Sequence, residues 1–82
     1  MEREQAILSG TVQAVLFQNP ENGYCVMRLR TEQGEVVTVV GTVPMTVVGE
    51  RLMVTGTWGS HPSHGPQFEA EFLERLIPET ES

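Results

Sequence analysis

Three side chains suited to contacting a single-stranded nucleic acid share one face of a predicted strand. Residues 24–31 alternate in polarity, so Tyr24, Arg28 and Arg30 point to the same side. Aromatic rings stack on bases, and guanidinium groups bind phosphates. Phe17 and Trp58 flank the loops that would border this face. The pattern favours a Tyr/Arg groove for weak DNA binding, unless the arginines only solvate an outer face and Phe17 and Trp58 fill the core.

Residues for catalysis or metal binding are scarce. His61 and His64 could chelate an ion from one loop, but a metal site needs three or four ligands, and Cys25 is the only other soft ligand. The chain has no lysine, so it cannot form a lysine-containing phosphate-binding loop. We therefore expect no catalytic residue, no metal site and no cofactor in this stretch of chain.

The charge balance favours another interpretation, a protein-docking module, which we take as the main functional expectation, with the Tyr/Arg groove as the alternative. The eleven acidic residues are all Glu and the five basic ones all Arg, giving a net charge of -6. Domains that bind nucleic acid without sequence preference usually present a basic surface. An acidic row formed by Glu69, Glu71 and Glu74 could instead meet a basic protein or a neighbouring domain. The apolar side chains predicted to take part in this docking are Leu73, Leu76 and Ile77.

Length and composition predict a single small domain. Eighty-two residues with 39% hydrophobic side chains allow a thin core but not two domains. A single cysteine excludes an internal disulfide and agrees with a reducing, cytoplasmic location. No apolar run approaches the roughly 20 residues of a membrane span, so no membrane contact is expected.

Five β-patterned runs fill most of the chain. We expect strands over residues 6–17, 24–31, 36–43, 50–58 and from 67 onward, with a loop over residues 59–66. The third run is almost continuously apolar, which predicts cover on both faces. Strict alternation predicts which side chains point inward from the first and fifth strands: Leu8, Val12, Ala14 and Leu16 in the first, and Phe68, Ala70 and Phe72 in the fifth.

Regularly spaced glycines favour a barrel, because a small barrel must bend its strands at the corners. The eight glycines are spread along the chain and are not pooled in one linker. The connection at residues 44–49 is too short for a helix. We predict an all-β, five-stranded Greek-key barrel of the OB-fold type over residues 6–77, with an SH3-like barrel as the alternative. Residues 1–5 are expected to be a tail, and residues 78–82 a tail or the start of a linker.

Several short motifs resemble one family in order and spacing. They are Gly10-Thr11-Val12, Phe17-x-Asn19-x-x-Asn22-Gly23-Tyr24-x-Val26, Val39-Val40-Gly41, Gly49-Glu50, Gly56-x-Trp58 and His64-Gly65-x-Gln67-Phe68. Together they resemble the N-terminal OB-like domain of bacterial RecD-like ATP-dependent DNA helicases, superfamily 1 enzymes related to the exonuclease V alpha subunit. The resemblance spans about residues 8–77.

The resemblance implies a non-catalytic accessory domain in front of a helicase motor. In the parent protein, the motor would unwind DNA in the 5′ to 3′ direction with ATP and magnesium, in DNA repair. No motor motif is present here, so the resemblance carries over no catalytic residue. The matched glycines that it implies at turns and bends are Gly10, Gly23, Gly41, Gly56 and Gly65. The partners it implies are the remaining helicase domains or another protein, with single-stranded DNA as a weak ligand.

Overall fold

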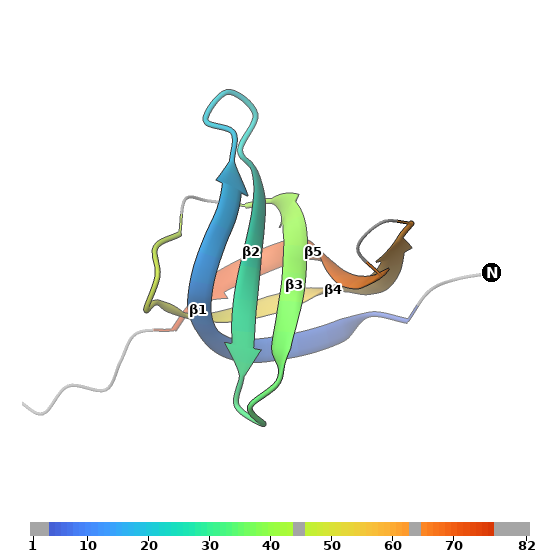
Figure 1. Cartoon of the computed structure of the whole chain (residues 1–82). Coiled ribbons are helices and arrows are strands. Elements are labelled where there is room, and N and C mark those ends of the chain that lie inside the picture. Colours follow the sequence, from blue (N-terminus) through green and yellow to red (C-terminus); the bar gives the residue numbers. More distant parts are fainter. Residues whose placement is uncertain (1–3, 44–45, 63–64, 77–82) are drawn as a thin grey trace, which may run out of the picture.

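The computed structural model describes residues 4–43, 46–62 and 65–76, and these form five strands (Figure 1). The strands are β1 (Ala6–Gln18), β2 (Tyr24–Thr31), β3 (Val36–Thr42), β4 (Arg51–His61) and β5 (Gly65–Arg75). They close into a barrel in the order β1-β2-β3-β5-β4. All neighbours are antiparallel except β3 and β5, which pair in parallel. The predicted all-β, five-stranded barrel is confirmed.

Strand β1 is long and curved because it pairs with β4 through its first half and with β2 through its second. Its register against β2 shifts twice, between Val12 and Ala14 and between Val15 and Phe17. Each shift inserts one extra residue and reverses which side chains face inward. Val15 therefore packs against the core, whereas Leu16 is 53% exposed. The prediction that Ala14 and Leu16 continue the inward row of Val12 is wrong for this reason.

The β4–β5 hairpin contains a third irregularity. Gly56 pairs with Ala70 and Thr55 with Phe72, so Glu71 is the extra residue of β5. Leu73 consequently packs against the core, and Phe72 is 67% exposed instead of inward as predicted. The hairpin is also longer than predicted: β4 continues to His61 and β5 begins at Gly65, where a loop over residues 59–66 was expected.

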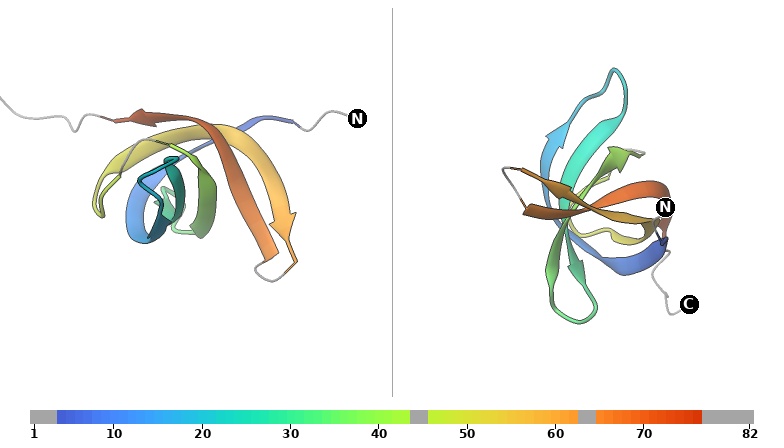
Figure 2. Two further views of the ribbon diagram at one scale, coloured as in Figure 1. Left: turned by 90° about the horizontal axis from the view of Figure 1, so that it is seen from above. Right: turned by 90° about the vertical axis from the view of Figure 1, so that its right-hand side faces the viewer.

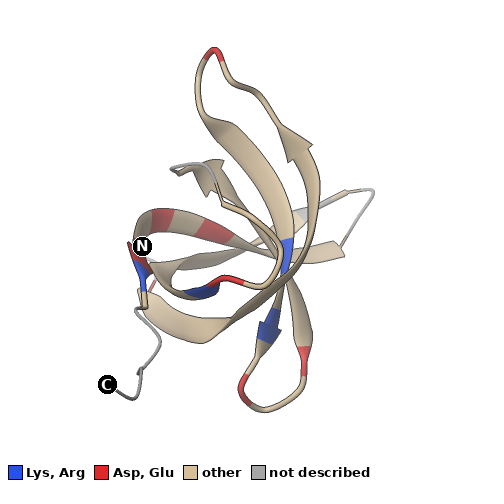
Figure 3. Ribbon diagram, turned by 90° about the vertical axis from the view of Figure 1, so that its left-hand side faces the viewer, with Lys and Arg blue, Asp and Glu red and all other residues tan. Residues whose placement is uncertain are grey.

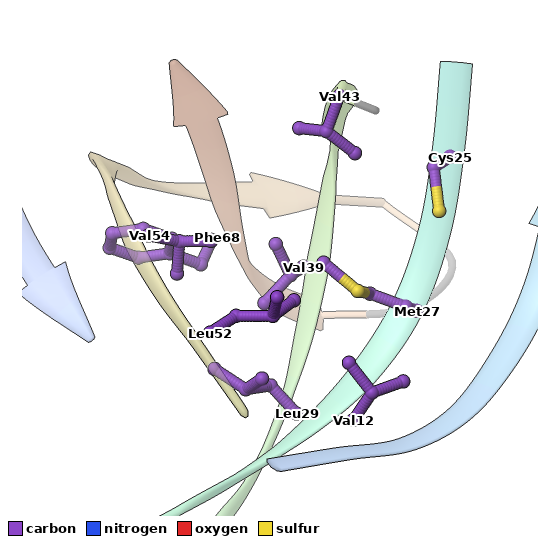
Figure 4. Packing of buried hydrophobic residues seen from close by; sticks show 9 residues of the cluster. All are labelled: Val12, Cys25, Met27, Leu29, Val39, Val43, Leu52, Val54 and Phe68. Atoms are coloured by element: carbon purple, nitrogen blue, oxygen red, sulfur yellow. The ribbon is translucent and has the colours of Figure 1, made fainter. Parts of the chain in front are cut away.

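The core lies along the barrel axis and draws on every strand. Figure 4 shows its side chains converging from β1 to β5 and from Val43 just after β3. The buried cluster consists of Val12, Cys25, Met27, Leu29, Val39, Val43, Leu52, Val54 and Phe68. The prediction that β3 is covered on both faces is correct only for the middle of the strand, where Val39 and Val40 are both buried. At the start of the strand, Val36 is 48% exposed.

The barrel closes at a short parallel seam. In the described chain, β3 and β5 pair through Val39 with Phe68 and Val40 with Glu69. Two views at right angles show the long, curved β4–β5 hairpin running across the β1–β2–β3 sheet (Figure 2). Between β3 and β4, residues 46–50 form a turn in which the Val47 amide donates to Glu50 Oε1 at 3.0 Å. The described residues include no helix able to cross a membrane.

Candidate nucleic-acid interface

The loop between β1 and β2 fixes the start of β2, where Tyr24 lies. Asn19 Oδ1 accepts a hydrogen bond from the Glu21 amide, and Asn22 Oδ1 accepts one from the Tyr24 amide, each at 2.9 Å. Gly23 completes the turn with a φ of 79°, in the left-handed region that disfavours other residues. Its carbonyl accepts from the Val43 amide at 3.2 Å, which ties the loop to the end of β3. The backbone on both sides of Tyr24 is therefore held in place.

A groove of about 310 Å³ crosses the outer face of β2 and β3. Leu16, Val26 and Val40 give it an apolar lining, while Tyr24 and Arg28 add an aromatic ring and a positive charge. Thr38 and Gln67 complete the lining. This combination can hold a stacked base beside a phosphate.

The second bulge of β1 turns two consecutive side chains toward this face. Leu16, the extra residue, lines the groove, and Phe17 stands opposite Val26 with 51% of its surface exposed. The rings of Phe17 and Tyr24 lie 6.4 Å apart at 55° to each other. Two exposed aromatic residues that meet at one end of a groove offer a stacking platform. We refer to this surface, formed by Leu16, Phe17, Tyr24, Val26, Arg28 and Val40, as the groove face.

The two arginines of β2 lie on the same side of the strand but in different surroundings. Arg28 lies between Ala14 and Thr38 and lines the groove. Arg30 lies beyond it, one residue before the β2–β3 turn, which carries Glu32 and Glu35. Figure 3 shows one basic stretch of β2 at the end of the strand, beside this acidic turn, and another farther from the turn. The positive charge of the groove face therefore comes from Arg28 more than from Arg30.

Trp58 occupies a different position from the one predicted. It pairs with Phe68 across β4 and β5, and their rings meet edge to face with centroids 5.1 Å apart. Phe68 is fully buried, so Trp58 covers one end of the core while 45% of its own surface stays exposed. It is not among the described residues that line the groove. Phe17, Tyr24 and Arg28 come together, and Trp58 stands apart from them.

The predicted glycines serve two structural purposes. Gly10 and Gly56 lie where strands approach closely: an added Cβ would run into the carbonyl of Arg30 in the first case and of Glu69 in the second. The other three predicted glycines, Gly23, Gly41 and Gly65, have positive φ angles.

A second exposed cluster, which the alternation pattern did not reveal, lies on the other side of the barrel. Ile7 of β1 and Phe72 of β5 are 62% and 67% exposed. Both lie opposite Thr55 of β4, so the three residues form one row across adjacent strands. The bulge at Glu71 turns Phe72 outward, and no local pattern in the sequence predicts this bulge.

The groups considered for metal or thiol chemistry are separate from both surfaces. Burial raises the pKa of the Cys25 thiol, and a hydrogen bond with Thr46 opposes this only in part. His64 lies outside the described residues, and the side chain of His61 is likewise not described. In the described part of the chain, no three His, Cys, Asp or Glu residues are grouped to hold a metal ion.

Comparison with solved structures supports the fold assignment. One chain of the S. pombe Stn1–Ten1 complex superposes with a TM-score of 0.72 at 19% identity, covering 90% of this chain and 59% of that one. The N-terminal domain of PriB from Thermoanaerobacter tencongensis, described as dimeric, gives a TM-score of 0.64 at 16% identity. That match covers 92% of this chain and 97% of the PriB chain. The present chain thus spans about three-fifths of the length of its Stn1–Ten1 counterpart.

The family comparison covers almost the whole sequence. Residues 5–78 match the family described as the OB-fold domain of the ATP-dependent DNA helicase YrrC. The five-stranded closed barrel and its structural neighbours agree with that fold, which decides between the OB-fold and the SH3-like alternative. The chain belongs to the family of OB-fold domains of ATP-dependent DNA helicases.

Proposed function

We propose that this domain is a non-catalytic accessory module of a RecD-like, ATP-dependent 5′ to 3′ helicase and that its groove face guides single-stranded DNA. The observation that carries the proposal is the groove between Tyr24 and Arg28, with its apolar lining. A base can stack on Tyr24 or Phe17 while Arg28 neutralises a neighbouring phosphate. Nucleotide hydrolysis with ATP and magnesium belongs, in this proposal, to motor domains of the parent protein.

The net charge of -6 limits the strength expected of this contact. Sequence-independent binding draws on the release of counterions from phosphates, and one or two arginines release few. We therefore expect weak binding that is measurable at low salt and lost at physiological salt. Such a contact suits a guide that must let the strand move, rather than an anchor that must hold it.

Fluorescence anisotropy with a labelled single-stranded oligonucleotide of about 12 nucleotides tests the proposal. Tyr24→Ala should lower the affinity by about 5- to 150-fold, the equivalent of about 1–3 kcal/mol for a stacked base. Arg28→Ala should also weaken binding, and the double change of Arg28 and Arg30 should weaken it further. Phe72→Thr, on the other side of the barrel, is the matched control and should change nothing. Wild-type protein that does not bind at low salt, or that binds equally well without Tyr24 and Arg28, would refute the groove.

A second candidate function, docking on the parent helicase or another protein, is favoured by the exposed Ile7 and Phe72. Exposure favours Ile7 and Phe72 over the apolar residues that the sequence predicted for docking. Leu73 packs against the core, and Ile77 lies outside the described residues. Of the acidic row predicted on β5, Glu71 and Glu74 lie beside Phe72.

A further inference from the structure

The outer surface of β1, β4 and β5 combines exposed apolar side chains with acidic ones. We call it the docking face and define it by Ile7, Met53, Thr55, Glu71, Phe72 and Glu74. Ile7, Thr55 and Phe72 form one cross-strand row, and Met53 stands opposite Glu74 in the next row along β4. Ile7 and Phe72 are both more than three-fifths exposed.

The spacing of the row suits a single inserted side chain. Neighbouring strands are about 4.8 Å apart, so Ile7 and Phe72 stand about 10 Å apart on either side of Thr55. The Thr55 side chain, which lies between them, is shorter than either. One apolar side chain of a partner can lie over Thr55 and contact Ile7 and Phe72 together, as buried anchor residues do at protein interfaces.

The charges around the row define the partner. Glu71 and Glu74 are exposed beside Phe72, and Glu71 Oε1 accepts a hydrogen bond from Gln5 Nε2 at 2.8 Å, which leaves its negative charge in place. The basic residues at the end of this face are both paired: Arg51 with Glu32 at 3.3 Å and Arg75 with Glu50 at 2.9 Å. The rim is therefore acidic, and it repels both DNA and a second copy of a chain of net charge -6.

We infer that the docking face binds a basic protein segment in which one apolar residue is flanked by arginine or lysine. The apolar residue would lie between Ile7 and Phe72, and its basic neighbours would meet Glu71 and Glu74. This inference rests on the accessory role proposed above, but it does not depend on the groove face. A domain held through this face presents its groove to DNA on the other side of the barrel.

A synthetic peptide with one leucine flanked by arginines serves as the probe, with backbone amide NMR of the 82-residue chain as the readout. The peptide should shift amides in three segments, residues 6–9, 53–57 and 71–74, and leave those of the groove face in place. Two matched peptides separate the contributions: serine in place of the leucine should weaken binding about fivefold or more, and glutamates in place of the arginines should abolish it. Shifts confined to the groove face, or equal binding of the serine peptide, would overturn the inference.

Variants of the protein complete the test. Phe72→Thr and Ile7→Thr should each weaken peptide binding about fivefold or more, and Glu74→Gln should reduce its salt dependence. Phe17→Thr makes the same type of change on the groove face and should leave peptide binding intact. The amide spectrum of each variant shows whether the barrel is folded.

Two further outcomes would contradict this assignment of the partner. Self-association that Phe72→Thr abolishes would identify a second copy as the occupant, and oligonucleotide-induced shifts at residues 71–74 would identify DNA. Loss of oligonucleotide binding in Tyr24→Ala with unchanged peptide binding would show that the two surfaces act separately. Absence of DNA binding in the wild type refutes the groove but leaves the docking face standing.

Discussion

The groove face and the docking face use the same structural device with opposite charge. Each owes an exposed aromatic residue to a bulge: the second bulge of β1 turns out Leu16 and Phe17, and the bulge of β5 turns out Glu71 and Phe72. The groove face adds Arg28, whereas the docking face adds Glu74. In our proposals, it is therefore the sign of the neighbouring charge, and not apolar exposure alone, that assigns one face to DNA and the other to a protein.

Among the predicted changes, glycine substitutions should have the largest effect. Gly10 and Gly56 each lie where two strands approach closely, and we expect each approach to support one of the two faces. We expect Gly10→Ala and Gly56→Ala each to lower the free energy of unfolding by about 1–3 kcal/mol, since the new methyl group meets a backbone carbonyl. Gly59→Ala is the control on β4, because its methyl group would meet only the end of the Glu69 side chain. Urea denaturation measures all three, and equal stability of Gly56→Ala and Gly59→Ala would contradict the close approach.

Charge changes should separate the two faces with a smaller effect. Arg28→Gln should reduce the slope of oligonucleotide affinity against salt by about 1, the value for one lost phosphate contact. Arg30→Gln should change the slope less, because Arg30 adjoins the acidic turn. Glu74→Gln, the matched neutralisation on the docking face, should leave the slope unchanged. Anisotropy titrations across a salt series provide the measurement, and a larger effect from Glu74 than from Arg28 would reverse the assignment of the faces.

The smallest effect is expected from Cys25, which belongs to the core that both faces share. Burial raises the pKa of its thiol above the ordinary value of 9.0, so the folded state favours the protonated form. The stability that this protonated thiol contributes is complete below pH 9.0 and is lost as the pH rises toward the raised pKa of the folded state. Cys25→Ala should lower stability at neutral pH but flatten its decline above pH 9, as followed by urea denaturation. An equally steep decline in the variant would rule out Cys25 as its source.

Sequence patterns predicted the barrel and the groove-facing row of β2 because that strand pairs without a bulge. Cys25, Met27 and Leu29 are buried as expected, and Tyr24 and Arg28 face outward. The first and fifth strands were predicted correctly only up to their bulges. A bulge is defined by how one strand pairs with the next, so the alternation pattern within a single strand does not reveal it.

The docking face could not be predicted for the same reason. Strict alternation assigned Phe72 to the core, and Ile7 gains its significance only from the pairing of β1 with β4 and of β4 with β5. Trp58 is the opposite case. Its aromatic side chain suggested a place at the groove, but its pairing with Phe68 places it at the end of the core. Cross-strand neighbours, which single-strand patterns do not contain, decided both cases.

The two-pair seam between β3 and β5 determines when the barrel can form. Val39 and Val40 have no partner across the seam until Phe68 and Glu69 arrive. During synthesis, the first three strands must therefore wait as an open sheet with Met27 and Leu29 accessible to water. Because contacts between distant parts of a chain form slowly, closure of this seam is expected to be the late step of folding and the point at which chaperones or aggregation compete with it.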